Sequence, residues 1–503
     1  MRYHLVPLGC QMNQSDAERI RTVLERLGYE RSEREEDANV LGVVACSVRQ
    51  KAIDKVYSKI HKWNEWKNDR NLLTFVSGCM LPEDREKFLK RFDLVFTINE
   101  LPGLPDMIRQ YGVVTPTSLA EPAGFESAHE NTEEDPRPAH AGEGRYANHG
   151  TAGVKGRAQP ADGADAPRLF TPTMPAGPHG VTEDIREGFW HVKPTHTSSF
   201  EAYVPIQNGC DKFCTFCAVP YTRGREVSRP SREILAEVEE LVASGYKTIT
   251  LLGQNVNSYG LDRRSDEMTF SRLLAEIGAL TRGEDLWVYF TSPHPRDMTD
   301  DVLETIAEYP TIGKQIHLPI QSGDDKVLIR MNRNYRVSGY RKVVDGIRRV
   351  LPETTLFTDI IVGFSGETEE QFQHTRAAME EFQYNMAYIA MYSPRPGAAS
   401  SRWKDDISQD EKKRRLHALT DVLQESGMAH NRNLLGRTIS VLVDGYDRRP
   451  GYLSAKTEGR IPVRIPDPGY SMIGSFASVK VTDCRPLSIF GEVVPAPAAV
   501  ETA

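Results

Sequence analysis

Six of the seven cysteines could act as metal ligands, and they fall into two sets of three. Cys210, Cys214 and Cys217 form a compact C-x3-C-x2-C motif, so one loop can present three thiolates. Thiolates favour zinc or iron–sulfur clusters. A structural zinc site would need a fourth ligand, and no cysteine or histidine follows closely enough to supply it. The motif therefore predicts a 4Fe-4S cluster with three protein ligands and one open iron.

An open iron of this kind could chelate the amino and carboxylate groups of a methionine moiety. The sulfonium of S-adenosylmethionine would then lie beside a one-electron donor. Electron transfer would cleave an S–C bond and give a 5′-deoxyadenosyl radical, which is one of the radical routes that cofactors provide. Three buried, unreactive thiols are the competing interpretation, and the compact spacing speaks against it.

Cys10, Cys46 and Cys79 lie far apart in the sequence, but each directly follows a predicted strand. The carboxyl ends of parallel strands share one edge, where open α/β sheets place their sites. We therefore expect these cysteines to meet and to hold a second three-ligand 4Fe-4S cluster. Three unrelated thiols remain the alternative, because their spacing is not compact. Cys484 is expected to be a structural thiol.

The elements that must position these cysteines form three predicted blocks, and the overall fold class is α/β. Residues 1–114 alternate apolar runs with amphipathic segments, which indicates a doubly wound parallel sheet. Residues 198–433 contain six strand–helix units, which predicts a partial (β/α)6 barrel. Residues 434–497 contain short strands between Gly/Pro turns, which is typical of a small antiparallel β-barrel. Its predicted strands are TISVLVDGY, YLSAKTEG, RIPVRI and FASVKVTDC.

Residues 115–197 differ in composition from the three blocks, being rich in Pro, Gly, Ala, His and acidic residues. A segment with so little apolar periodicity cannot bury enough surface to offset the entropy of ordering it. It is predicted to be a low-complexity, disordered linker or surface insertion.

Bulk properties restrict the class of protein. No apolar run approaches the length of a membrane span, and the N-terminus lacks the layout of a secretory signal. A cytoplasmic location without a membrane partner is expected, so disulfides are disfavoured. The net charge of −8 is not that of a protein whose main task is binding nucleic acid. Any RNA contact must therefore use local basic patches.

Polar or special residues end the predicted strands of the second block, where such barrels place their catalytic face. Each could contact cofactor or substrate, or could serve only in a packed turn or a structural hydrogen bond. These candidates are Gln254, Asn255, Ser292, His294, Gln321, Asp359 and Gly363. Arg223 and Arg225 follow the cysteine loop and could pair with a cofactor carboxylate, an RNA phosphate or a structural carboxylate.

Two groups of basic residues are candidates for RNA contact. Lys412, Lys413, Arg414 and Arg415 form a compact run on a predicted helix, for which a solvated helix face is the alternative. In the third block, basic residues accompany tyrosines, a combination that suits phosphate contact and base stacking. The basic candidates there are Arg437, Arg448, Arg449, Lys456, Arg460 and Arg464, beside Tyr446, Tyr452 and Tyr470.

With these motifs in view, the sequence resembles the radical S-adenosylmethionine methylthiotransferase family. GCDKFCTFCAVPYTRGREVSRP resembles its radical signature, and GCQMNQSDAE, ACSVRQKAIDKV and SGCM resemble its N-terminal blocks. LLGQNVNSY, TSPHP, HLPIQSGDDKVLIRMNRNY and TDIIVGFSGETEEQF resemble its later blocks, and the third block resembles the TRAM RNA-binding module. The likeness spans nearly the whole chain except residues 115–197. Ser365 and Ala398 stand where the family commonly has proline and threonine.

The resemblance implies two 4Fe-4S clusters and S-adenosylmethionine as cofactors. One S-adenosylmethionine would donate its methyl group to sulfur at the auxiliary cluster on Cys10, Cys46 and Cys79. A second would be cleaved at the other cluster, and the radical would abstract hydrogen from carbon 2 of an adenine that then receives the methylthio group. An inert C–H bond requires a radical, since no general acid or base reaches it.

The family has three branches that differ in substrate, and the GCQMN block resembles the branch acting on isopentenylated adenosine beside the tRNA anticodon. The sister branches act on threonylcarbamoyl-adenosine in tRNA or on a ribosomal-protein aspartate, and remain alternatives. A non-catalytic iron–sulfur RNA-binding scaffold is the alternative from another class. The resemblance further implies a monomer whose partners are the tRNA anticodon stem-loop, a sulfur donor and an electron donor such as flavodoxin or ferredoxin.

Overall fold

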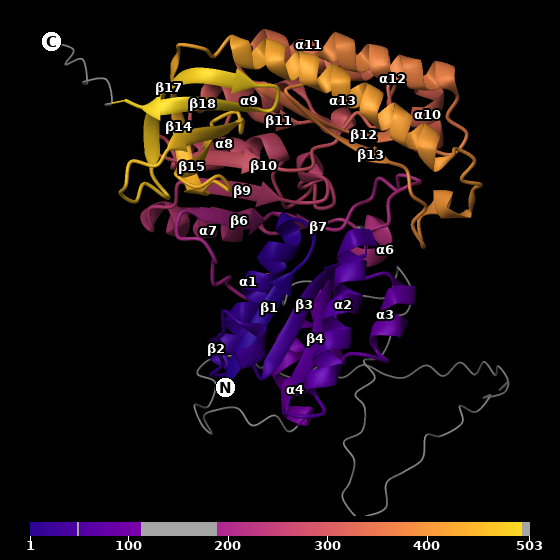
Figure 1. The fold of residues 1–503 in the computed structure, drawn as a ribbon, viewed down its shortest axis with the longest axis vertical. Helices are drawn as coiled ribbons and strands as arrows, with labels where there is room; N and C mark the ends of the chain where they lie inside the picture. Colours follow the sequence, from indigo (N-terminus) through magenta and orange to yellow (C-terminus); the bar gives the residue numbers. More distant parts are fainter. Residues whose placement is uncertain (48–49, 112–188, 495–503) are drawn as a thin grey trace, which may run out of the picture.

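The computed structural model describes residues 1–47, 50–111 and 189–494, which form three packed units (Figure 1). The predicted linker therefore lies largely outside the described residues, and only its last part, from residue 189, can be compared with the structure. Within the described ranges, no helix combines the length and apolarity needed to span a lipid bilayer.

The first unit is a five-stranded parallel sheet with helices on both faces, as predicted. The strand order is β2 (Glu30–Arg31), β1 (Arg2–Pro7), β3 (Val40–Cys46), β4 (Leu73–Cys79) and β5 (Leu94–Val95). The helices are α1 (Gln11–Arg26), α2 (Gln50–Trp66), α3 (Pro82–Phe88) and α4 (Leu104–Gln110). Every residue of β3 and β4 is buried, which agrees with their nearly continuous apolar sequences. The two-residue strand β2 was not predicted, because it is too short to show a periodicity.

The second unit contains the six predicted parallel strands. They are β6 (Glu201–Pro205), β9 (Thr248–Leu252), β10 (Trp287–Phe290), β11 (Gln315–His317), β12 (Thr355–Val362) and β13 (Met386–Met391). They form two three-stranded sheets, β10-β9-β6 and β11-β12-β13, and a bridge between Val288 and Ile312 connects the two. The result is an open, partial barrel.

Helices cover the outside of this barrel (Figure 1). They are α7 (Ser231–Ala243), α8 (Phe270–Leu280), α9 (Asp300–Glu308), α11 (Val337–Val350), α12 (Glu369–Phe382) and α13 (Gln409–Arg432). Four short elements lie at the strand ends, where they shape the loops described below: β7 (Gln207–Asn208), α6 (Val219–Arg223), β8 (Val227–Ser228) and α10 (Asp325–Arg330).

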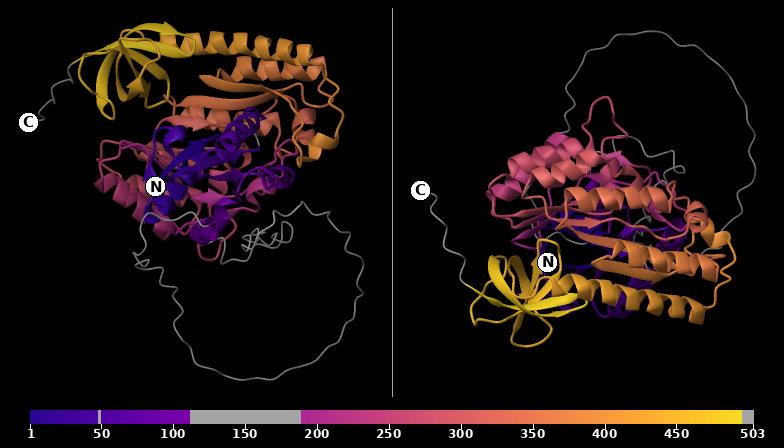
Figure 2. Two further views of the ribbon diagram at one scale, coloured as in Figure 1. Left: turned by 60° about the horizontal axis from the view of Figure 1, so that its bottom comes forward. Right: turned by 90° about the horizontal axis from the view of Figure 1, so that it is seen from above.

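The third unit is a closed five-stranded barrel that follows α13 directly and packs at its C-terminal end (Figure 2). Its strands are β14 (Thr438–Tyr446), β15 (Tyr452–Thr457), β16 (Pro462–Pro466), β17 (Phe476–Arg485) and β18 (Ser488–Val493). The predicted small barrel is confirmed, but it is not antiparallel throughout, because β16 and β18 pair in parallel. β18 was not predicted, since its sequence SIFGEV contributes only Ile489 as a fully buried apolar side chain.

The segment just before the second unit is packed rather than disordered. Phe189, Trp190 and Val192 are buried in the core of the first unit. Thr22 of α1 donates a hydrogen bond to the carbonyl oxygen of Lys193 over 2.8 Å. The composition of residues 115–197 as a whole concealed these apolar residues, so the folded part of the chain resumes earlier than the predicted boundary at residue 198.

Candidate functional site

Cys10, Cys46 and Cys79 lie together at the carboxyl edge of the first sheet. Cys46 and Cys79 are the last residues of β3 and β4 and are paired in register, and Cys10 directly precedes α1. Asn13 connects the group, because its Oδ1 accepts hydrogen bonds from Sγ of Cys10 at 3.4 Å and of Cys79 at 3.7 Å. Its Nδ2 donates to the carbonyl oxygen of Ala45 over 2.5 Å, which fixes the amide on β3. The fold thus brings the three distant cysteines together.

Cys210, Cys214 and Cys217 lie on the loop between β7 and α6. Gly209 precedes this loop with φ of +82°, and a Cβ there would lie 2.0 Å from the carbonyl oxygen of Arg225. Only glycine fits so close an approach in this conformation. Gln254, at the end of β9, accepts a hydrogen bond from the Gly209 N–H over 2.6 Å. The predicted candidate Gln254 therefore anchors the start of the cysteine loop.

The far side of the cysteine loop is held by the segment after α10. Thr215 donates through its backbone N–H to the carbonyl oxygen of Met331 at 3.0 Å. Asn332 Nδ2 donates to the carbonyl oxygen of Phe213, also at 3.0 Å. Arg333, which is buried, donates from Nη1 to Sγ of Cys214 at 3.3 Å. The loop is thus held at its start and in its middle by other segments of the second unit.

Burial disfavours ionisation of the thiols in both cysteine sets. Burial raises the pKa of Cys79 and of Cys210 to about 12 and that of Cys217 to about 11, so the thiolates need a strong positive charge nearby.

Of the partners considered for Arg223, the structure shows a structural carboxylate, and the side chain is buried. Its Nε donates to Sγ of Cys79 at 2.9 Å and its Nη2 donates to Asp16 Oδ2 at 2.5 Å. A third hydrogen bond runs from Nη1 to Asn208 Oδ1 at 3.0 Å. Arg225, by contrast, forms an exposed ion pair with Asp211 at 2.7 Å. Arg223 therefore lies beside Cys79 of the first cysteine set, whereas Arg225 forms an ion pair at the surface.

The other strand-end candidates have different surroundings. Asn255 is buried; its Nδ2 donates to Ser258 Oγ at 2.7 Å, while its Oδ1 has no hydrogen-bond partner among the described residues. Ser292 is exposed, whereas Gln321 is buried and lies after β11, where it forms an isolated bridge with Ile360 of β12. His317 Nε2 lies 3.2 Å from Asp359 Oδ2. Asn255 is therefore the candidate with an unsatisfied acceptor to offer a ligand.

Two further candidates serve the fold. Burial lowers the pKa of His294 to about 2, so its ring is neutral, and its Nδ1 accepts the backbone N–H of Arg296 at 3.3 Å. Gly363 has φ of +69°, and a Cβ there would lie 2.4 Å from Cγ of Lys412. The backbone at Gly363 therefore approaches α13 closely.

Glu226 is a site residue that the sequence did not single out. Its carboxylate accepts a hydrogen bond from Ser258 Oγ at 2.5 Å through Oε1, while Oε2 has no hydrogen-bond partner among the described residues. Burial raises the pKa of Glu226 to about 7. It lines a cavity of about 210 Å³ together with Lys212 and Arg296. Its position just after α6, near the cysteine loop, was a signal, but its burial depends on contacts with distant segments.

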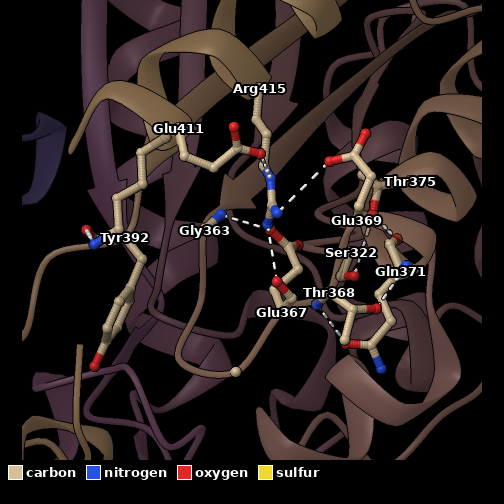
Figure 3. A network of polar contacts seen from close by, with 12 residues as sticks. Ser322, Gly363, Glu367, Thr368, Glu369, Gln371, Thr375, Tyr392, Glu411 and Arg415 are labelled. Carbon is tan, nitrogen blue, oxygen red and sulfur yellow. Dashed lines mark hydrogen bonds and ion pairs between the residues drawn. The ribbon is translucent and has the colours of Figure 1, made fainter. Parts of the chain in front are cut away.

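The basic run on α13 is only half exposed, because Lys413 and Arg414 face solvent whereas the other two residues are buried. Lys412 is fully buried and donates to the carbonyl oxygen of Tyr392 at 3.0 Å and to Asp405. Arg415 is also buried and lies between Glu367 and Glu411, each at 2.7 Å (Figure 3). The same Glu367 accepts the Gly363 N–H at 2.6 Å (Figure 3). The run has the composition of a solvated face, but Arg415 ties α13 to the loop after β12 and Lys412 ties it to the segment after β13.

The basic candidates in the barrel divide into paired and exposed residues. The paired ones are Lys456 with Asp444 at 2.8 Å, Arg464 with Asp447 at 3.0 Å and Arg437 with Glu353 at 3.9 Å. Arg460 stacks 4.0 Å over the Tyr289 ring and donates to Thr250 Oγ1, so it joins the barrel to the second unit. Arg448 and Arg449 are exposed, as are Tyr446 and Tyr470 at 71% and 63%.

Three family models match the chain in succession. Residues 2–98 match the model described as uncharacterized protein family UPF0004, residues 204–379 match the radical SAM superfamily, and residues 432–494 match the TRAM domain. The matched ranges correspond to the three units of the fold.

Full-length relatives are also evident. The tRNA-2-methylthio-N(6)-dimethylallyladenosine synthase of Geobacter metallireducens is 35% identical over 493 residues, covering 97% of this chain and 98% of that protein. The synthase of the same name from Thermus thermophilus is 34% identical over 501 residues, covering 99% and 93%. Among solved structures, the radical S-adenosylmethionine methyltransferase TsrM of Kitasatospora setae is similar with a TM-score of 0.51 at 13% identity, over 90% of this chain and 78% of that one. The last similarity concerns the fold alone.

Proposed function

This chain belongs to the family of tRNA-2-methylthio-N(6)-dimethylallyladenosine synthases, and from that membership we propose its reaction and the residues that carry it. It is a radical S-adenosylmethionine methylthiotransferase that adds a methylthio group to carbon 2 of isopentenylated adenosine beside the tRNA anticodon. The observation that carries the proposal is the pair of three-cysteine sets, one on each side of the short helix α6.

Each cysteine set is proposed to hold a 4Fe-4S cluster through three thiolates. Cys210, Cys214 and Cys217 would hold the cluster that binds S-adenosylmethionine, and Cys10, Cys46 and Cys79 would hold the auxiliary cluster. When bound, the first supplies the electron that cleaves S-adenosylmethionine to a radical, and the second supplies the sulfur that is methylated and transferred.

The remaining side chains orient these groups. Gln254 holds the start of the cysteine loop through the Gly209 N–H, and Asn13 holds two auxiliary thiols on one amide oxygen. Asn255 Oδ1 and Glu226 Oε2 are buried acceptors without a hydrogen-bond partner in the described part of the chain, so they could accept from the amino or hydroxyl groups of S-adenosylmethionine. Ser292, Gln321 and Asp359 are also proposed to contact cofactor or substrate.

The closed barrel is proposed to bind the tRNA anticodon stem-loop through its exposed tyrosines and arginines. Tyr446 and Tyr470 offer faces for base stacking, and Arg448 and Arg449 offer charges for phosphates. Arg437, Lys456 and Arg464 would exchange their carboxylate partners for phosphate on binding. We further propose a cytoplasmic monomer supplied by a sulfur donor and by an electron donor such as flavodoxin or ferredoxin.

Mass spectrometry of tRNA nucleosides tests the proposal directly. A strain lacking this gene should lose 2-methylthio-isopentenyladenosine and accumulate the unthiolated precursor. Complementation with the wild-type chain should restore the product, and complementation with Cys10→Ala should not. Persistence of the nucleoside in the deleted strain would contradict the substrate assignment and point to a sister substrate.

A further inference from the structure

Arg223 connects the two cysteine sets through a single short helix. α6 begins at Val219, next but one to Cys217, and ends at Arg223. α6 lies next to the first unit (Figure 1). The Arg223 guanidinium crosses the boundary between the two units and contacts Cys79 and Asp16. One cysteine set is therefore tied, through about one and a half helical turns, to a thiol of the other.

The charge of Arg223 acts on Cys79 with little screening. Arg223 is 8% exposed, Asp16 is fully buried and Cys79 is 5% exposed, so water does not separate the three groups. Asp16 raises the pKa of Arg223 further above its ordinary value, so the guanidinium is positive. Each of the three guanidinium nitrogens donates a hydrogen bond: one to the Cys79 thiol, one to the Asp16 carboxylate and one to the Asn208 amide oxygen. These hydrogen bonds fix the orientation of the Arg223 guanidinium relative to Sγ of Cys79.

A positive hydrogen-bond donor on a ligating sulfur stabilises the reduced form of a cluster, because that form carries the more negative charge. A buried carboxylate at the same place opposes this effect through its own charge. The two groups should therefore shift a reduction potential in opposite directions.

We propose that Arg223 is a positioning residue that raises the reduction potential of the auxiliary cluster by donating a charged hydrogen bond to Cys79. The inference rests on the proposed auxiliary cluster on Cys10, Cys46 and Cys79. Because Arg223 belongs to the second unit, this cluster acquires its working potential only when the two units are docked. Asp16 orients the guanidinium and sets how much of its charge remains uncompensated.

The test is an electron paramagnetic resonance redox titration of the auxiliary cluster alone. The background chain carries Cys210→Ala, Cys214→Ala and Cys217→Ala, so only the auxiliary set can bind iron. In this background, Arg223→Gln should make the midpoint potential more negative, Arg223→Lys should restore most of the shift, and Asp16→Asn should make the potential more positive. Iron and sulfide content is measured in parallel.

The outcomes separate the two levels of the proposal. A background chain that assembles no cluster would contradict the auxiliary site itself. A cluster whose potential is unchanged in Arg223→Gln, or shifts in the same direction in Arg223→Gln and Asp16→Asn, would overturn the role of Arg223 alone. If Arg223→Gln fails to retain the cluster, the potentials of Arg223→Lys and Asp16→Asn still test the proposal. An electrostatic role predicts a more positive potential in Asp16→Asn and a nearly unchanged one in Arg223→Lys. A purely structural ion pair does not predict the more positive potential.

Discussion

Arg333 donates a hydrogen bond from Nη1 to Sγ of Cys214 at 3.3 Å, and its other two hydrogen-bond partners carry no charge. These partners are the Tyr335 hydroxyl at 3.2 Å and the Pro319 carbonyl oxygen at 3.1 Å. The arginine beside Cys79, in contrast, shares its charge with Asp16. The two cysteine sets therefore have electrostatically different environments, although each is contacted by one buried arginine.

Removing the uncompensated cation should impair the radical step. We expect Arg333→Met to lower the reduction potential of the cluster on Cys210, Cys214 and Cys217 and to reduce 5′-deoxyadenosine formation about 10- to 100-fold. The rate is measured with a strong chemical reductant and with a weaker one, and the loss should be larger with the weaker. Arg333→Lys is the matched control. Equal losses with both reductants would contradict an electrostatic role.

The two cysteine sets should separate by product. Cys10→Ala should abolish the methylthio product while 5′-deoxyadenosine still forms, whereas Cys210→Ala should abolish both. Liquid chromatography with mass spectrometry measures the two products, and iron content is measured on the same samples. Cys484→Ala is the control, because Cys484 lies in the barrel core, where its Sγ is 3.8 Å from Met428 Sδ. A loss of iron in Cys484→Ala would contradict this division of roles.

Glu226 should make stability depend on pH. Burial raises its pKa from 4.5 to about 7, so between these values the folded chain binds more protons than the unfolded chain. Stability should therefore fall as pH rises through this range, by up to about 3 kcal/mol at about 1.4 kcal/mol per pKa unit. Urea unfolding at pH of about 5 and about 7 compares the wild-type chain with Glu226→Gln, which should lack this decline. Equal declines in both proteins would show that Glu226 ionises normally.

The Arg415–Glu367 pair should matter for stability rather than for RNA. Both side chains are buried, and removing one leaves the other charge uncompensated, so Arg415→Ala should lower the free energy of unfolding by about 3–5 kcal/mol. The exposed neighbour Lys413 supplies the control, since Lys413→Ala should change it by about 0.5 kcal/mol or less. Chemical denaturation measures both. If Arg415→Ala unfolds at the wild-type denaturant concentration, the pair is not structural.

RNA affinity should depend on the exposed rim of the barrel. We expect Tyr446→Ala to weaken binding of the anticodon stem-loop by about 1–3 kcal/mol through lost stacking. Replacing Arg448 and Arg449 by alanine should reduce the slope of log affinity against log salt by about 0.7 for each lost phosphate contact to single-stranded RNA. Arg460→Ala is the control, because Arg460 packs on Tyr289. An unchanged slope in the double variant would place the RNA elsewhere.

The sequence was most informative for features that a short stretch of residues determines, such as strands and the residues at their ends. The six strands of the second unit were all predicted, and the strand-end positions of Cys46 and Cys79 followed from the alternation of strands and helices. The place of Arg223 beside them could not be assigned, because its partners Asp16 and Cys79 are 207 and 144 residues away in the sequence.

Burial of charge was the feature that the sequence concealed. Lys412 and Arg415 occupy a run that has the composition of a solvated helix face, yet both are enclosed by carboxylates and carbonyl oxygens from the loop after β12 and its surroundings. Glu226 was concealed for the same reason. A local sequence pattern shows how charged residues are spaced along a helix or loop, but it does not show which of them are buried in the tertiary structure.

The order of strands in the closed barrel bears on how the chain folds during synthesis. β18 lies between β16 and β17, so these two strands present unpaired edges until β18 has left the ribosome. The sheet and partial barrel that precede it can fold earlier, since domains generally fold as units from the N-terminus. The proposed RNA-binding surface is thus completed last. In a nascent chain, both cysteine sites would therefore form before the chain can bind tRNA.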